Sequence, residues 1–231
     1  MNDRPGHYKE LAKRYGPKDY WSQVGRIVAG KPVGEDQIQL IVDSILRGLE
    51  IGEGDLLLDL CCGNGALTDR IFDRCRGGFG VDYSPPLIEV AKRDFERPGE
   101  REYRLQDVME FLETAEVTEK FNKALCYGSL TYLSLEAAQR FLVLVRERFP
   151  KVERLMFGNL PDRTKARKFL GPLYREGIED DPNSAIGIWR TEEEFVALAE
   201  QTGWSCAISR QAPPFFAANY RYDAVLTPLS R

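Results

Sequence analysis

Apolar residues recur along the chain with two different spacings, and each spacing predicts one kind of element. Between 36 and 50 they follow the i, i+3, i+4, i+7 pattern of an amphipathic helix, whereas "LLLDL" at 56–60 is apolar at nearly every position. A continuous apolar run of this length is typical of a strand buried on both faces of a sheet. We therefore expect a helix over 36–50 and a central strand directly after it.

Strand and helix patterns go on alternating to the end of the chain. The expected strands after the first are 78–84, 102–106, 123–127, 154–158, 204–210 and 220–229. Ser84, Ser134 and the Thr191–Glu194 pair stand where N-caps would begin helices. Short connections between alternating elements predict a mostly parallel α/β sheet with helices on both faces. The last two strands have little between them and can pair antiparallel.

Two segments stand apart from this alternation. Residues 1–35 form an N-terminal arm, and 36–231 form a single domain in which the loop-rich stretch 161–190 is an insertion on the substrate side. The arm is rich in aromatic residues for a solvated tail. Both a lid over a bound ligand and a plain packing helix remain open for it.

Acidic residues occupy the ends of the first three strands. Asp59 lies at the end of the first, Asp82 closes the second and Asp107 closes the third. The carboxyl ends of parallel strands share one edge of a sheet, where ligands bind in folds of this kind. We therefore expect the three carboxylates to line a single site.

The loop after the first strand does not match a phosphate-binding motif. Gly63 and Gly65 begin a dinucleotide fingerprint, but Thr68 stands where its third glycine belongs, and no Walker loop occurs. Asp59 would also repel a pyrophosphate at short range. Asp82 can accept hydrogen bonds from a ribose diol, and an acid on the next strand can accept from adenine. A nucleoside with a cationic tail and no phosphate fits this pattern, and S-adenosylmethionine is such a molecule.

Three short motifs make the chain resemble the class I S-adenosylmethionine-dependent methyltransferase superfamily, from about residue 36 onward. "DLCCGNG" is similar to the first motif, with Cys61 in place of a glycine, while "GVDYS" and "LQDVM" resemble the second and third. In the fourth, Asn122 stands where an aspartate is common. The resemblance implies a Rossmann-like sheet of seven strands in the order 3-2-1-4-5-7-6, with the last strand antiparallel.

The resemblance also implies a set of cofactor-binding residues, with Asp82 on the ribose, Tyr83 beside the adenine, and Asp107 and Val108 at the adenine amine. The full set is Asp59, Cys61, Gly63, Asn64, Gly65, Asp82, Tyr83, Asp107, Val108 and Tyr127.

Composition narrows the possible partners. With 43% apolar residues, 29% charged residues and a net charge of −4, the 231-residue chain is typical of a cytoplasmic protein without a basic nucleic-acid-binding surface. No run reaches the ~18 apolar residues of a membrane span. The five cysteines form no CxxC pair, and the acidic run at 179–181 lacks a histidine, so we expect reduced thiols and no metal. The expected partner is a small-molecule substrate, and the protein is a monomer or a homodimer.

The sequence defines the residues around the methyl acceptor less sharply than those around the cofactor. Methyl transfer needs alignment more than a strong base, but a hydroxyl acceptor must lose a proton. The candidate catalytic residues are His7 on the arm, Tyr127, Ser129 and Tyr132. Candidate substrate-binding residues are aromatic or basic and lie in the arm or the late segments: Tyr20, Trp21, Arg163, Trp189, Arg190, Tyr220 and Arg221.

After the fourth strand, members of the superfamily that methylate amino groups of nucleic acids carry the signature [DN]PP[YFW]. This sequence has "YGSL" there. The leading hypothesis is O-methylation of a small metabolite. N- or C-methylation, an NAD(P)-dependent oxidoreductase and a non-catalytic nucleoside-binding module remain as alternatives.

Overall fold

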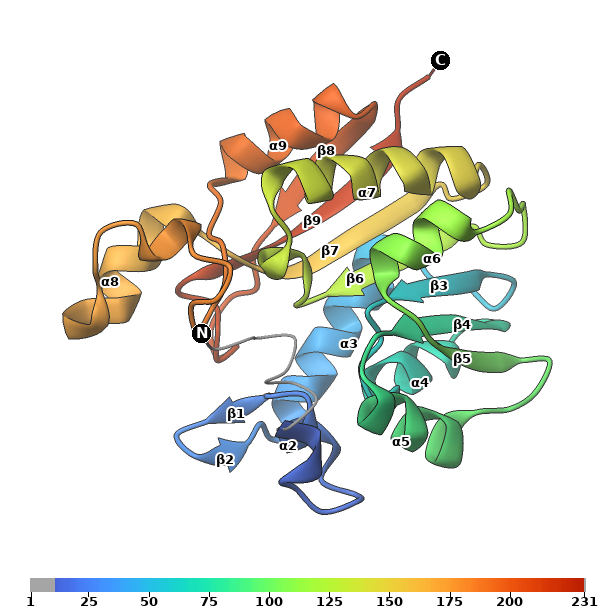
Figure 1. Ribbon diagram of the computed structural model, residues 1–231, viewed down its shortest axis with the longest axis horizontal. Coiled ribbons are helices and arrows are strands. Elements are labelled where there is room, and N and C mark those ends of the chain that lie inside the picture. Colours follow the sequence, from blue (N-terminus) through green and yellow to red (C-terminus); the bar gives the residue numbers. More distant parts are fainter. Residues whose placement is uncertain (1–10, 231) are drawn as a thin grey trace.

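One seven-stranded sheet organises residues 11–230, the part of the chain that the computed structural model describes (Figure 1). Its strands are β3 (Leu56–Leu60), β4 (Gly77–Asp82), β5 (Arg101–Leu105), β6 (Lys123–Tyr127), β7 (Arg154–Pro161), β8 (Trp204–Ser209) and β9 (Arg221–Pro228). Their order is β5-β4-β3-β6-β7-β9-β8, and β9 runs antiparallel to both of its neighbours. In chain order this is 3-2-1-4-5-7-6, which confirms the predicted topology.

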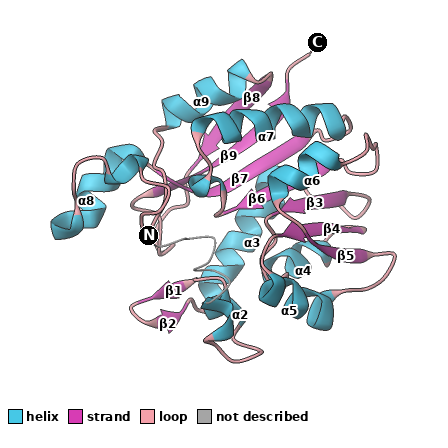
Figure 2. Cartoon of the chain, viewed as in Figure 1, coloured by secondary structure: helices cyan, strands magenta, loops and turns pink. Residues whose placement is uncertain are grey.

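Helices cover both faces of the sheet (Figures 1 and 2). One face carries α3 (Glu35–Leu49), α4 (Ala66–Phe72) and α5 (Pro85–Phe95), and the other carries α6 (Val108–Thr114), α7 (Leu135–Arg148) and α9 (Glu192–Gln201). The core is accordingly split into two apolar layers, one on each side of the strands. Every residue of β3 is buried, as its unbroken apolar sequence predicted.

The predicted helix starts differ in how they are capped. Ser134 accepts a hydrogen bond from the Ala137 N–H, and Thr191 and Glu194 form the reciprocal capping box. Ser84 occupies the N-cap position of α5, but its buried hydroxyl caps nothing. Its own N–H instead donates to the carboxylate of Asp82, which joins this helix start to the candidate site.

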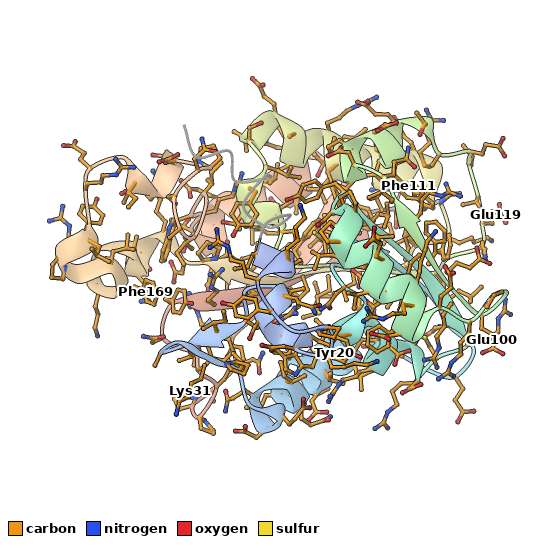
Figure 3. All side chains as sticks on the ribbon, turned by 60° about the horizontal axis from the view of Figure 1, so that its bottom comes forward. Tyr20, Lys31, Glu100, Phe111, Glu119 and Phe169 are labelled. Atoms are coloured by element: carbon orange, nitrogen blue, oxygen red, sulfur yellow. The ribbon has the colours of Figure 1, made fainter. Side chains whose placement is uncertain are left out.

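The N-terminal arm has more structure than its sequence indicated. It contains the short helix α2 (Tyr20–Gln23) and an antiparallel hairpin of β1 (Ile27–Val28) and β2 (Lys31–Pro32). The 161–190 stretch contains α8 (Ala166–Leu170) and several single 3₁₀ turns. Figure 3 shows the hairpin at Lys31 and the insertion at Phe169 at one end of the molecule, opposite the loops that hold Glu100 and Glu119. Those two loops lead into β5 and β6, so the arm and the insertion flank the carboxyl ends of the strands.

Asn122 closes the opposite, amino-terminal edge of the sheet. Its side chain accepts from the Leu56 N–H at 2.9 Å and donates to Asp55 at 2.6 Å. The departure from the fourth motif is therefore structural and far from the carboxyl ends. No helix within residues 11–230 is long and apolar enough to cross a membrane.

Candidate active site

The loop from β3 to α4 turns sharply through three residues with positive φ. Cys61 has φ +79°, Gly63 +60° and Gly65 +77°. A glycine adopts this region without strain, whereas a cysteine there carries a cost of order 1–2 kcal/mol. Cys61 stands where the family's first glycine would be. The replacement therefore keeps the shape of the loop at some expense in stability.

Asp82 connects this loop to the second strand. One of its carboxylate oxygens accepts from the Gly63 N–H and the other from the Ser84 N–H, both at 2.9 Å. The side chain is buried, and burial raises its pKa to about 6 despite these two bonds. Each oxygen retains a second lone pair, so the carboxylate can still accept from a ribose diol.

Asp59 is a buried carboxylate that is only half satisfied. Oδ2 accepts from the Thr68 hydroxyl at 2.5 Å, while Oδ1 has no hydrogen-bond partner. Burial raises its pKa to about 7, and the charge of Asp82 adds to the increase while Arg26 opposes it. A cationic ligand group would pair with the partnerless Oδ1, and its charge would favour the ionised form of Asp59.

Asp107 lies just after the carboxyl end of β5, where it begins α6. Its Oδ1 caps α6 by accepting from the Met109 and Glu110 N–H groups, and the residue is exposed. Val108 next to it is buried, and Tyr83 is half-buried. The charge of Asp107 reaches Asp82 and raises its pKa. The charge of Asp82 in turn raises the pKa of Asp59, and the three acids lie at or just after the carboxyl ends of the neighbouring strands β3, β4 and β5.

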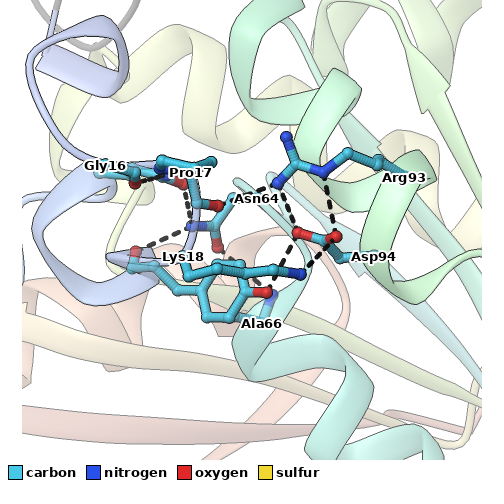
Figure 4. Close-up of polar contacts among 9 residues, drawn as sticks. Gly16, Pro17, Lys18, Asn64, Ala66, Arg93 and Asp94 are labelled. Atoms are coloured by element: carbon cyan, nitrogen blue, oxygen red, sulfur yellow. Dashed lines mark hydrogen bonds and ion pairs between the residues drawn. The ribbon is translucent and has the colours of Figure 1, made fainter.

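The arm lies directly against the glycine loop. Asn64 is 1% exposed and donates to the Tyr20 carbonyl at 2.8 Å and to Gln23 at 2.9 Å (Figure 4). A Cβ on Gly63 would lie only 3.1 Å from a methyl group of Val24. Asn64 was predicted to bind the cofactor, but its amide nitrogen already has two bonds to the arm.

A second set of contacts fixes the outer side of the arm. Asp94 on α5 accepts from Lys18 at 2.8 Å, from Tyr20 at 3.1 Å and from Arg93, which also reaches the Pro17 carbonyl (Figure 4). Trp21 donates to Glu35 at 2.9 Å. Tyr20 and Trp21, both proposed to bind substrate, thus direct their polar atoms to the scaffold.

Tyr127 ends β6, the strand on the other side of β3. Its ring lies against Gly158 of β7, where a Cβ would collide with it. The side chain is buried and its hydroxyl has no hydrogen-bond partner. Burial raises the pKa of this hydroxyl well above its usual range, so it keeps its proton at neutral pH.

Asn159 follows Gly158 and was not singled out by the sequence. It has φ +65° at an irregularity of β7, with its N–H bonded to Asp223 at 2.7 Å and its carbonyl to Arg221 at 2.5 Å. Bulges of this kind often re-aim side chains beside active sites. Both contacts come from β9, more than 60 residues further along the chain.

The predicted substrate residues of the late segments divide into two groups. Arg163 is committed to ion pairs with Asp180 and Glu194, and buried Arg190 donates to the Leu133 carbonyl. The others form an aromatic cluster near Tyr127, in which Tyr220 stacks on Phe169 at 3.8 Å and Trp189 lies 6.0 Å from Tyr220. The buried indole N–H of Trp189 has no hydrogen-bond partner, and the guanidinium of Arg221 lies over the ring of Tyr220.

The remaining predicted catalytic residues are placed as follows. Ser129 and Tyr132 lie at the 3₁₀ turn after β6, and both are half-exposed. His7 lies outside the described residues. Within residues 11–230 no three histidine, cysteine, aspartate or glutamate side chains gather into a metal-binding group.

A hollow in the described surface lies elsewhere in the fold. It has a volume of about 600 Å³ and is lined by residues of the α3–β3 and α4–β4 connections, including Ile51, Glu53 and Arg74. These connections lead into the amino ends of the strands. The three carboxylates and the glycine loop lie at the opposite edge, so this hollow is not the candidate site.

Comparison with known proteins agrees with the geometry. Residues 57–148 match the family described as "Methyltransferase domain". The match identifies this segment as a methyltransferase domain, and the segment resembles the class I S-adenosylmethionine-dependent superfamily. S-adenosylmethionine is the methyl donor of that superfamily. The matched residues include the glycine loop and all three strand-end acids.

Individual similarities are partial in sequence and broad in fold. An uncharacterized methyltransferase of Schizosaccharomyces pombe is 32% identical over 76 residues, 33% of this chain and 27% of that protein. A probable cobalt-precorrin-6B C(15)-methyltransferase (decarboxylating) of Methanocaldococcus jannaschii is 28% identical over 105 residues, 43% of this chain and 52% of that protein. The chain thus covers about half or less of these curated relatives.

The crystal structure of magnesium protoporphyrin IX methyltransferase from Synechocystis PCC 6803 with bound SAH shares the fold. Its TM-score is 0.61 at 14% identity, with 98% of this chain and 95% of that chain covered.

The residues of the site fit the donor of the superfamily. The partnerless oxygen of buried Asp59 suits a cationic tail, and the second lone pairs of Asp82 suit a ribose. The glycine loop matches neither the dinucleotide fingerprint nor a Walker loop.

Proposed function

We propose that this protein transfers the methyl group of S-adenosylmethionine to an oxygen atom of a small metabolite. The observation that carries the proposal is the row of carboxylates at the carboxyl ends of β3, β4 and β5, with one buried Asp59 oxygen that no group of the described chain satisfies. When bound, the donor supplies a methyl carbon on a sulfonium, which is a strong leaving group. The protein's part is then to align an acceptor with that carbon.

The proposed cofactor roles follow the strand ends. Asp59 faces the cationic tail, Asp82 accepts from the ribose and Asp107 faces the adenine amine. Cys61, Gly63 and Gly65 shape the loop, while Asn64 acts through the arm that it holds. Tyr83 and Val108 border the adenine.

For Tyr127 we propose the role of a hydrogen-bond donor. Its raised pKa favours a hydrogen-bond donor over a general base. We assign its hydroxyl to orienting the acceptor and retain Tyr132, Ser129 and His7 as candidates for receiving a proton. An aromatic cluster with the partnerless Trp189 N–H favours an acceptor with an apolar body.

The arm is proposed to act as a lid. Its contacts with Asn64 and Asp94 hold it over the glycine loop, so donor entry requires some of them to open. The boundary near residue 35 and the substrate-side position of 161–190 fit this arrangement, because both segments flank the carboxyl ends of the strands.

A methyl-transfer assay tests the proposed activity. The full chain, S-adenosylmethionine labelled in its methyl group and a panel of small hydroxy compounds, acids and amines should give labelled product together with S-adenosylhomocysteine. Label on nitrogen or carbon would replace the O-methylation proposal with one of its alternatives. Binding of S-adenosylhomocysteine without product from any acceptor would favour a non-catalytic nucleoside-binding protein.

A further inference from the structure

Charged groups of the arm and of β9 act on Tyr127, which ends β6. The guanidinium of Arg26, from the arm, lies 5.7 Å from the centre of its ring. Arg26 and Arg221 of β9 both lower the pKa of the hydroxyl, against the larger effects of burial and of Asp223. The hydroxyl itself makes no hydrogen bond. A buried donor with two cations near it is the setting of an anion-binding site.

Arg26 stands between the cofactor side and the acceptor side. Its guanidinium also lies 5.8 Å from the ring of Trp21, and its charge lowers the pKa of Asp59. The backbone of Arg26 is fixed by hydrogen bonds with Trp21 at 2.8 Å and with Val33 at 2.9 Å. The arm therefore delivers this cation to a defined place next to Tyr127.

Arg221 is the first residue of β9. It donates from Nη1 to the Asn159 carbonyl, and its guanidinium lies 4.8 Å from the Tyr220 ring. Its Nε is buried and has no hydrogen-bond partner. Tyr127 and Arg221 thus each present a buried donor that no acceptor of the described chain satisfies, and such donors are costly to leave unpaired.

Asp223 is the carboxylate acting on Tyr127, and it already accepts from Ser44 at 2.9 Å and from the Asn159 N–H. A negatively charged acceptor would lie beside the two guanidinium groups and could accept from both unpaired donors.

We propose that the methyl acceptor is the carboxylate of a small organic acid, held between Arg26 and Arg221 and hydrogen-bonded by the Tyr127 hydroxyl. A planar carboxylate matches the donor fork of a guanidinium. The nearby rings of Trp21, Tyr127 and Tyr220 suit an apolar or aromatic body. This inference rests on the proposed function and adds the substrate class to it.

The step balances without a base. A carboxylate oxygen forms a bond to the methyl carbon while the carbon–sulfur bond breaks, and its electron pair stays on sulfur. The products are a methyl ester and a neutral thioether. Because an organic acid is already ionised at neutral pH, no proton has to be removed. The high pKa of Tyr127 is then an advantage, since its hydroxyl remains a donor throughout.

The product distinguishes an ester from an ether. The full chain is incubated with methyl-labelled S-adenosylmethionine and a panel of aliphatic and aromatic acids, each paired with the alcohol of the same skeleton, together with 4-hydroxybenzoate, which carries both groups. We expect label in the acids only, released as methanol by mild alkali. Alkali-stable label would overturn the carboxylate proposal and leave the methyltransferase proposal standing. No product from any member, with or without S-adenosylhomocysteine binding, would overturn the inference.

Two variants test the assigned residues. Arg26→Gln and Arg221→Gln should each raise the KM of the labelled acid at least about tenfold, the loss expected for one charged hydrogen bond. Affinity for S-adenosylhomocysteine should stay within about twofold. Lys31→Gln, which removes an exposed charge from the same hairpin, should change neither quantity.

If the glutamine variants fail to fold, Arg26→Lys and Arg221→Lys keep the charge but lose the fork, and a raised KM is again expected. A fall in S-adenosylhomocysteine affinity would place the cofactor's own carboxylate at Arg26 and overturn the assignment.

Discussion

Asp82 and Gly63 are joined by a 2.9 Å hydrogen bond from the glycine N–H to the carboxylate. The bond links the end of β4 to the loop that follows β3, so one side chain both shapes the loop and presents acceptor lone pairs to the ribose. Residues 19 apart in the sequence are thereby fixed as one unit. The two halves of the nucleoside site depend on each other through this contact.

Removing this carboxylate should weaken cofactor binding. Asp82→Ala loses both the ribose acceptor and the support of the loop, so the Kd for S-adenosylhomocysteine should rise at least tenfold, about 1.4 kcal/mol or more. Isothermal titration measures it. Glu89→Ala, an exposed acid on the following helix, is the matched control and should bind normally. An unchanged Kd for Asp82→Ala would refute the ribose assignment.

Asp59 should make the protein less stable as the pH rises. Burial raises its pKa from 3.8 to about 7, so the folded state binds its proton more tightly than the unfolded state. The resulting penalty is absent below the unfolded pKa and complete above pH 7. At pH 8 without ligand, Asp59→Asn should therefore be more stable than the native chain, by about 1–3 kcal/mol.

Thermal unfolding between pH 5 and 8.5 tests this linkage. The difference between Asp59→Asn and the native chain should shrink as the pH falls toward 5, and the variant should bind S-adenosylhomocysteine more weakly at every pH. A variant that is less stable at pH 8 would contradict the half-satisfied carboxylate.

Gly158 should tolerate no side chain. In Gly158→Ala the added methyl group would collide with the Tyr127 ring, and overpacking in a well-packed core costs about 1–3 kcal/mol. We expect a lower free energy of unfolding in urea and a loss of methyl transfer. Gly54→Ala adds a methyl group where no atom lies within 4 Å and should behave like the native chain. Equal stability of the two variants would show that Tyr127 is not held against β7.

The arm should loosen when Asn64 is shortened. Asn64→Ala removes the hydrogen bonds to Tyr20 and Gln23, so amide hydrogens of residues 16–28 should exchange faster, while those of β3 and β6 should not. Gln39→Ala, an exposed amide on α3, provides the control. Uniformly faster exchange across the sheet would mean that Asn64 supports the core and not the arm.

The sequence predicted the sheet and the cofactor edge because both depend on local patterns. A buried strand such as β3 is recognisable from its apolar run, and the acids at successive strand ends occupy one edge by the geometry of parallel sheets. The loop was recognisable because only a few motifs place glycines there.

The acceptor side depends on contacts between distant parts of the chain, which no local pattern encodes. Arg26 meets Tyr127 across a sequence separation that only folding closes, and Asn159 at the bulge is bonded to Asp223 and Arg221. The place of Asn64 in the loop predicts cofactor binding, and the structure adds the hydrogen bond from its amide nitrogen to the arm. Sequence position alone could not show which partner the amide had taken.

Calorimetric titration of the full chain with S-adenosylhomocysteine and, separately, with NADH tests the phosphate-free nucleoside site most directly. The acidic edge and the loop without a phosphate motif predict saturable one-to-one binding of S-adenosylhomocysteine and no binding of NADH. Saturable binding of NADH alone would contradict the account and favour an oxidoreductase.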